Sequence, residues 1–377
     1  MEKIKQFDNI DKICIFGAGE LGINLKNILN IFGMFDCYID NDKNKQNESP
    51  DNKVINFKEY MNGRKNNFIV IAASLQNIEV ISNQLEQNGL KKRIDYCDIN
   101  CFLKEMFPTI VFYKYNKLYT NLVQITLTER CTLKCEKCAH ACWNVNNYNV
   151  DMSLNDAKKS ADYFFSMFDL VNEFVLIGGE PFLYENLKEI IKYIGEKYRK
   201  KMIVFSLTTN GTIIPDDEVV ELFDKYNMTL RVSDYSVTLP GLKEKYKKLY
   251  EKFDGKDVRV WKTNDTNAWF DYGFGEFNRN NNINDLKNAF RKCRTECREI
   301  REYKYYYCVM ARSVSDNMNL NIGKDDYIDL RNVIDRKEIL EFELGNIKKE
   351  YLDMCNYCRG SEAKNFLIPA AKQRRNV

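Results

Sequence analysis

Three cysteines near the middle of the chain, Cys131, Cys135 and Cys138, have a spacing that could bind a metal centre. Three thiolates within one short loop can wrap a single soft metal centre. A [4Fe-4S] cluster normally takes four cysteines, so three would leave one iron open to chelate a small molecule. Structural zinc is the alternative, because zinc takes closely spaced cysteines and a fourth ligand. Cys142 or His140 could supply that ligand.

A second group of five cysteines lies late in the chain, and its last two members form a CxxC pair. A CxxC pair joined to distant cysteines can hold a metal and tie the end of the chain to the preceding domain. Iron–sulfur and structural zinc are both compatible with such thiolates. The five residues are Cys293, Cys297, Cys308, Cys355 and Cys358.

A G-x-G-x-x-G pattern occupies Gly17, Gly19 and Gly22, between a short apolar run and a helical stripe, and Asp40 ends the next apolar run. Such glycines permit a tight turn and close approach of a phosphate, and the acidic residue could accept hydrogen bonds from a ribose. The pattern predicts a Rossmann-like unit that binds a nucleotide. A docking module that kept the fold and lost the ligand is the alternative.

The elements that must hold these residues are those of an α/β protein. In residues 1–105, apolar runs alternate with helical stripes, which indicates a parallel sheet covered on both faces. From Leu122 onward, five β–α steps indicate a partial barrel of parallel strands, and the CxxxCxxC motif follows the first of them. We expect strands at 12–16, 37–39, 68–73, 122–126, 174–177, 202–207, 229–233 and 258–261, and helices at 21–29, 78–90, 154–168, 185–200, 216–226 and 242–253.

These elements predict three domains. They are an N-terminal Rossmann-like parallel sheet over residues 1–105, a partial (β/α)6 barrel over 118–290 and a small cysteine-rich extension over 291–377. Residues 106–120 are expected to join the first two. Ser153 and Asp216 are expected to cap the N-termini of helices.

The composition is that of a soluble globular protein, with 44% hydrophobic and 29% charged residues. The net charge of +3 gives no broad basic field, so a nucleic acid is not an expected partner. We find no apolar run long enough for a transmembrane helix and no signal-peptide pattern, and we expect a cytoplasmic protein without a membrane partner. One histidine excludes a multi-histidine metal site, and 13 cysteines favour metal ligation over disulfides.

The first cysteine motif and its surroundings resemble the radical S-adenosylmethionine (SAM) superfamily over roughly residues 120–310. The match begins at Gln124 and runs into the CxxxCxxC spacing. Three later segments, each at the end of an expected strand, agree with it. One residue departs from the pattern: Lys137 stands where the superfamily usually has an aromatic residue. The agreeing segments are Gly178-Gly179-Glu180-Pro181, Thr208-Thr209-Asn210-Gly211-Thr212, and Ser233.

This resemblance implies that Cys131, Cys135 and Cys138 hold a [4Fe-4S] cluster whose open iron chelates SAM. An electron from the cluster would cleave SAM to a 5′-deoxyadenosyl radical, which abstracts a hydrogen atom from the substrate. A flavodoxin- or ferredoxin-type protein would supply the electron. The residues implied to contact SAM are Gly178, Gly179, Glu180, Pro181, Asn210 and Ser233.

The late cysteines resemble the auxiliary-cluster extensions of radical SAM enzymes, in their one-cluster form. This implies a second [4Fe-4S] cluster, which could accept an electron from a substrate radical. The implied ligands are Cys297, Cys308, Cys355 and Cys358, with Cys293 as the substitute for Cys297.

The N-terminal pattern resembles the small Rossmann-like modules of sugar-modifying and surface-polysaccharide enzymes, which implies a nucleotide or a nucleotide-linked substrate. The leading interpretation is therefore a radical SAM enzyme that oxidises or rearranges a small, nucleotide-linked molecule. The alternatives are a radical SAM enzyme that modifies ribosomally made peptides, a zinc-stabilised nucleotide-binding protein, and an NAD-dependent nucleotide-sugar dehydrogenase.

Overall fold

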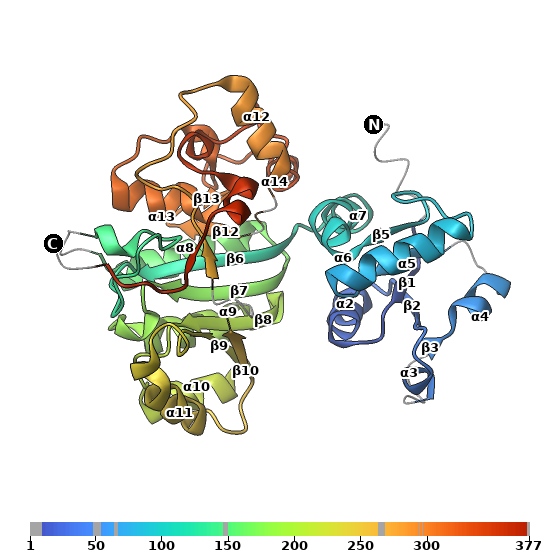
Figure 1. Ribbon diagram of the computed structural model, residues 1–377, viewed down its shortest axis with the longest axis horizontal. Coiled ribbons are helices and arrows are strands. Elements are labelled where there is room, and N and C mark those ends of the chain that lie inside the picture. The colour runs from blue at the N-terminus through green and yellow to red at the C-terminus, as the bar shows by residue number, and fades with distance from the viewer. Residues whose placement is uncertain are drawn as a thin grey trace. The chain divides into compact units, whose positions relative to one another are not determined.

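The computed structural model describes residues 10–47, 54–63, 67–145, 150–262, 268–293, 295 and 297–374. The chain divides into two compact units, Met1–Tyr119 and Thr120–Val377, and each is described by itself (Figure 1).

The first unit is built on a parallel sheet with the strand order β3-β2-β1-β4-β5. All four residues of β1 and of β4 are buried, as expected for inner strands covered on both faces. The strands are β1 Ile13–Phe16, β2 Phe35–Ile39, β3 Val54–Ile55, β4 Phe68–Ile71 and β5 Tyr96–Asp98, and the helices are α2 Glu20–Ile31, α3 Lys43–Asn47, α4 Phe57–Asn62, α5 Leu75–Gln87, α6 Ile99–Cys101, η1 Phe102–Met106 and α7 Phe107–Tyr115.

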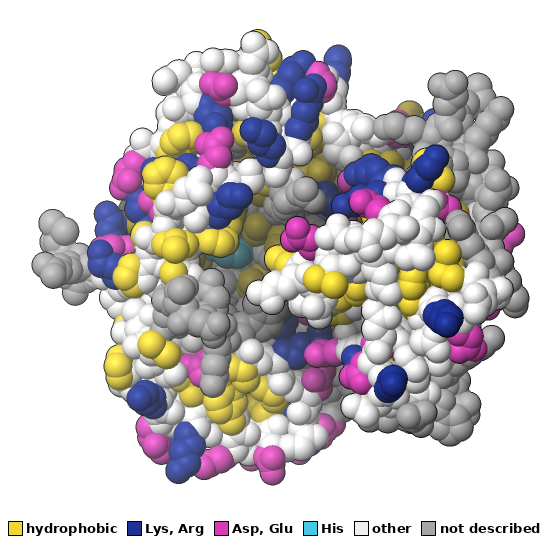
Figure 2. All heavy atoms as spheres, turned by 45° about the vertical axis from the view of Figure 1, so that its right-hand side comes forward, with side chains coloured by type: hydrophobic (Ala, Val, Ile, Leu, Met, Phe, Trp, Pro, Cys, Tyr) yellow, Lys and Arg dark blue, Asp and Glu magenta, His cyan; other side chains and the backbone are white. Residues whose placement is uncertain are grey.

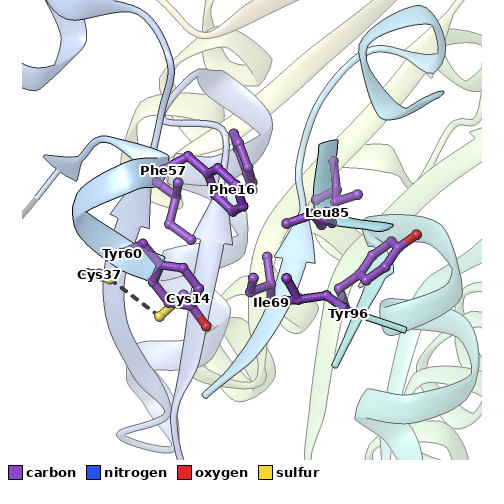
Figure 3. Packing of buried hydrophobic residues seen from close by; sticks show 11 residues of the cluster. Cys14, Phe16, Cys37, Phe57, Tyr60, Ile69, Leu85 and Tyr96 are labelled. Carbon is purple, nitrogen blue, oxygen red and sulfur yellow. Dashed lines mark hydrogen bonds between the residues drawn. The ribbon is translucent and has the colours of Figure 1, made fainter. Parts of the chain in front are cut away.

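The core of this unit forms where the helices pack on the sheet. Phe16 of β1 stacks on Phe57 of α4, and Leu85 of α5 is buried in the same cluster (Figure 3). Cys14 and Cys37 lie opposite each other on β1 and β2 and belong to this core, with their sulfur atoms 3.3 Å apart.

The second unit contains an eight-stranded sheet with the order β10-β9-β8-β7-β6-β12-β13-β14. Strands β7 to β10 pair in parallel, and β12 pairs in parallel with β6. The strands are β6 Tyr119–Thr128, β7 Leu170–Gly178, β8 Met202–Thr209, β9 Met228–Asp234, β10 Val258–Lys262, β12 Arg298–Arg301, β13 Lys304–Tyr306 and β14 Tyr327–Asp329.

Helices connect the parallel strands as the hydrophobic pattern predicts. Ser153 and Asp216 cap two of them, because their side chains accept hydrogen bonds from Asp156 N and Val219 N. The α/β fold class is confirmed. The connecting helices are α8 Leu154–Met167, α9 Leu187–Tyr198, α10 Asp217–Lys225 and α11 Lys243–Lys252, with short turns at η2 Cys142–Asn144, η3 Pro181–Leu183, η4 Arg199–Lys201 and η5 Pro240–Leu242.

The rest of the second unit consists of short elements around the late cysteines. Strands β11 Ala268–Phe270 and β15 Leu367–Pro369 form a separate antiparallel pair, although almost 100 residues separate them in the sequence. The helices are α12 Ile283–Lys292, α13 Val309–Met318, α14 Arg336–Glu343, η6 Lys324–Asp326, η7 Asp353–Tyr357 and η8 Gly360–Asn365.

The segment 106–120 differs from the expected linker. It contains helix α7, which belongs to the first unit, and the division falls after Tyr119. Phe107, Ile110 and Val111 of this helix are buried, so hydrophobic packing orders the segment. None of the helices in the described ranges is both long enough and apolar enough to cross a membrane.

Candidate active site

The loop that carries the first cysteines leaves the end of β6 and is held by the end of β7. Gly179 N donates to Thr128 O at 2.8 Å, and Glu180 N donates to Arg130 O at 2.8 Å. A Cβ atom on Gly179 would lie 2.4 Å from Arg130 O, so only glycine permits this approach. The Cys131 thiol lies 3.3 Å from Gly179 O. The glycine pair thus fixes the start of the cysteine motif against the sheet.

The end of β8 completes the surroundings of Cys131. Asn210 Nδ2 lies 3.5 Å from Cys131 Sγ, and Asn210 N donates to the buried Glu180 carboxylate at 2.8 Å. Thr209 Oγ1 donates to the same carboxylate. Burial raises the pKa of Glu180 to about 7. Segments 48 and 79 residues away from Cys131 therefore meet it at one edge of the sheet.

A cavity of about 360 Å³ opens beside these strand ends. Of the described residues expected to contact SAM, Glu180 and Pro181 do not line this cavity; both are buried. The sequence did not predict the aromatic wall, because β11 carries no motif. The lining includes Cys138, Gly178, Gly179, Asn210 and Ser233, together with Tyr235, Trp269, Phe270 and Tyr272.

Lys137 lines this cavity in the place where an aromatic residue was expected. Its Nζ lies 2.7 Å from Glu276 Oε1 and 3.6 Å from Asp271 Oδ2. The same Asp271 oxygen lies 2.9 Å from Nη1 of Arg359, which directly follows Cys358. A chain of charges therefore joins the first cysteine motif to the CxxC pair.

A second cavity, of about 580 Å³, is lined by all five late cysteines. Gln124, Thr208 and Arg231 of the sheet line its other side. The two cavities adjoin, because Ala139, His140, Ile177, Thr208, Phe270 and Tyr272 line both of them.

His140 occupies the shared wall, and its Nδ1 is buried without a hydrogen-bond partner among the described residues. Burial, together with the nearby Arg312, lowers its pKa to about 4, so the imidazole is neutral at pH 7. Figure 2 shows the single histidine, in cyan, among hydrophobic side chains.

The late cysteines influence one another electrostatically. Burial raises the pKa of Cys308 well above its ordinary value and those of Cys355 and Cys358 to about 12, and the thiol of Cys293 contributes to all three shifts. Cys297 lies next to β12 and lines the same cavity. The structure therefore places Cys293 in this group together with the four expected ligands.

The thiols of the first motif have unequal acidities. Burial raises the pKa of Cys131 and of Cys135 to about 12. A hydrogen bond with Cys142 lowers the pKa of Cys138 to about 7. A bound cation would favour the thiolate form of all three, as a metal–sulfur centre requires.

In the described residues, neither cysteine group forms the close set of ligand atoms that a tetrahedral zinc site uses. Tetrahedral zinc places its sulfur ligands roughly 3.8 Å apart. Among the described residues, the only three ligand atoms within 4.8 Å of one another belong to Cys14, Asp36 and Cys37 of the first unit. No three sulfur atoms of either cysteine group, among the described residues, are as close together as these.

In the first unit, a cavity of about 450 Å³ lies at the glycine motif. Gly17, Gly19, Asp40 and Lys45 line it. Asp40 Oδ2 accepts from Ala18 N at 2.8 Å and lies 3.6 Å from Lys45 Nζ, so the carboxylate already holds the glycine loop. The third glycine of the motif, Gly22, does not line the cavity, because it packs against Gly17 O.

The similarity to a known protein family lies within the second unit. Residues 125–263 match the family model of the Radical SAM superfamily. A probable GTP 3′,8-cyclase of Methanococcus aeolicus is 28% identical over 140 residues, which are 37% of this chain and 43% of the relative. The antilisterial bacteriocin subtilosin biosynthesis protein AlbA of Bacillus subtilis is 34% identical over 108 residues, which are 28% of this chain and 22% of the relative.

The chain thus spans less than half of the length of these relatives. Among solved structures, that of BtrN in complex with AdoMet and 2-DOIA is similar to this chain. The match covers 68% of this chain and 97% of the BtrN chain, with 14% sequence identity and a TM-score of 0.39.

Proposed function

Because residues 125–263 match the family model of the Radical SAM superfamily, we propose that the chain is an enzyme that binds a [4Fe-4S] cluster through Cys131, Cys135 and Cys138 and SAM in the adjoining cavity. The observation that carries this proposal is the convergence of Gly179 and Asn210, from two neighbouring strand ends, on Cys131. With one open iron, this cluster would supply the one-electron cleavage of SAM, which would release methionine and provide a 5′-deoxyadenosyl radical for hydrogen abstraction from the substrate.

The residues of the chain bind and orient SAM in this proposal. The backbone at Gly178 and Gly179 lines the pocket, and the Glu180 carboxylate is held in place by Asn210 N and Thr209. Asn210 and Ser233 offer polar groups to the nucleoside. Trp269 and Tyr272 form an apolar wall that excludes water.

The 580 Å³ cavity is proposed as the substrate site, with an auxiliary [4Fe-4S] cluster on its far side. Cys308, Cys355 and Cys358 would hold that cluster with Cys297 or Cys293. A substrate radical formed there would lie between the two cysteine groups, so the second cluster could take up an electron. This arrangement suits an oxidation, with a flavodoxin- or ferredoxin-type protein as the reductant of the first cluster.

The substrate is proposed to be a small molecule linked to a nucleotide. The cavity beside Gly19, Asp40 and Lys45 supports this, because it combines a helix N-terminus, a carboxylate and a cation. A peptide substrate is the second candidate. The observation in its favour is the 34% identity to AlbA, whose name describes bacteriocin biosynthesis.

The test is SAM cleavage by anaerobically reconstituted protein with dithionite. Wild type is expected to form 5′-deoxyadenosine, Cys135→Ala to form none, and Cys101→Ala, a matched change in the first unit, to retain activity. If wild type forms none and its metal is zinc, the radical proposal fails and a zinc-stabilised nucleotide-binding protein replaces it.

A further inference from the structure

The last described residues of the chain run along the first cysteine motif. Glu136 N donates to Lys372 O at 2.7 Å, and Arg374 N donates to Lys134 O at 2.8 Å. Cys135 and Gln373 are the partners of an antiparallel bridge. We call residues Ala371–Arg374 the C-terminal strap.

The side chain of Gln373 reaches a cysteine of the motif directly. Its Nε2 donates to Cys135 Sγ at 3.3 Å and to Ala371 O at 2.7 Å. Its Oε1 accepts from Lys134 N at 2.9 Å. All polar atoms of this amide are therefore committed to the cysteine loop or to the strap itself, which fixes the orientation of the N–H group toward the sulfur.

The strap is anchored at both ends. On its N-terminal side it continues from β15, which pairs with β11 of the cavity wall. Lys372 Nζ lies 2.8 Å from Glu136 Oε2, and the Arg374 guanidinium lies 4.5 Å from the centre of the Trp143 ring. The exposed fraction of Cys135 is only 7%. Contacts on both sides of Gln373 thus hold its amide against a sulfur that is almost fully buried.

We propose that the C-terminal strap is part of the cluster site and that Gln373 is a positioning residue that tunes the cluster through the N–H···S contact with Cys135. This inference rests on the proposed function. Reduction adds negative charge, which spreads onto the cysteine sulfur atoms. An N–H dipole aimed at one of these atoms stabilises the reduced form and makes the midpoint potential less negative. Gln373 therefore makes reduction of the first cluster easier.

The test compares Gln373→Met with Gln87→Met, a matched change at an exposed site of the first unit. The midpoint potential is measured by redox titration followed by electron paramagnetic resonance, on the signal that changes when SAM is added. That signal belongs to the cluster with the open iron. We expect Gln373→Met to be about tenfold harder to reduce, equal to about 59 mV for one electron, and Gln87→Met to be unchanged.

Gln373→Glu provides a second variant, because its carboxylate can still accept from Lys134 N but cannot donate to the sulfur. It too is expected to have a more negative potential. A role limited to folding would lower the iron content and leave the potential of the assembled cluster unchanged. Variants that assemble a cluster with the wild-type potential would overturn the inference.

Metal-free protein supplies a readout that does not depend on the cluster. Iodoacetamide is expected to alkylate Cys135 several-fold more slowly in Gln373→Met than in wild type, because the lost N–H group stabilises the reactive thiolate, while the rate at the buried Cys97 stays the same. Equal rates at Cys135 would mean that this N–H group does not act on the sulfur, which contradicts the inference. A wild type that assembles no SAM-sensitive cluster would instead defeat the proposed function and the tuning role together, whatever the alkylation rates.

Discussion

The guanidinium of Arg312 forms an ion pair with the carboxylate of Glu129 inside the second unit. Arg312 lies on α13, which begins directly after Cys308, and Glu129 lies two residues before Cys131. Arg312 Nε also lies 2.5 Å from Glu299 Oε1 on β12. Burial alone would raise the pKa of Glu129, but Arg312 holds it below its usual range. One buried cation therefore ties the two cysteine groups together.

Removal of the Arg312 guanidinium should destabilise the folded protein. We expect Arg312→Met to lower the free energy of unfolding by about 3–5 kcal/mol, because it leaves two buried carboxylates without their partner. Urea unfolding of the metal-free protein measures the change. Arg331→Met, at an exposed pair with Asp329, serves as the control and should cost less than about 1 kcal/mol. A similar small loss for both variants would show that Arg312 does not hold the unit together.

Stability should depend on pH through Asp326. Its buried carboxylate accepts from Asp353 N and Met354 N, and burial raises its pKa from 3.8 to about 7. The folded protein therefore keeps a proton that the unfolded chain releases near pH 4, so this group stabilises the fold at low pH and the contribution is lost as the pH rises to 7. The loss is on the order of 4 kcal/mol.

Asp326→Asn carries no titrating group and should remove this part of the pH dependence. Unfolding free energies of both proteins, measured between pH 5 and pH 8, give the comparison. Parallel profiles for the two proteins would exclude Asp326 as the source.

The glycine pair at the end of β7 should not tolerate a side chain. In Gly179→Ala the new methyl group would lie 2.4 Å from Arg130 O and 2.8 Å from Cys131 Cβ. The cysteine loop must then move, at a cost of about 1–3 kcal/mol in stability. We expect SAM binding, measured anaerobically by equilibrium dialysis, to weaken at least about tenfold, which corresponds to 1.4 kcal/mol. Gly241→Ala, where a Cβ meets nothing within 4 Å, should behave as wild type.

Iron analysis can decide which cysteine completes the second group. Cys293 contributes to the raised pKa of Cys308, Cys355 and Cys358, so we expect Cys293→Ala to lose about four iron atoms per chain. Cys297→Ala should then keep most of its iron. The reverse result would restore Cys297 as the ligand that the sequence resemblance implies.

The sequence alone determined the local features of this protein. Strands β6 to β10 of the second unit were predicted because short, mainly apolar runs between helical stripes mark buried parallel strands. The helix caps Ser153 and Asp216 could be recognised because a cap is a contact between residues three apart. The cysteine motif and the glycine pair were recognised for the same reason, since each is a short pattern at a strand end.

Tertiary structure decided which distant residues meet at the site. Gln373 reaches Cys135 across 238 residues, and Arg312 reaches Glu129 across 183. The aromatic wall at Trp269 depends on the pairing of β11 with β15. No periodicity or spacing encodes such contacts. They form only where packed elements bring remote segments together. The strength of the resulting ion pairs and hydrogen bonds depends on the geometry of that packing.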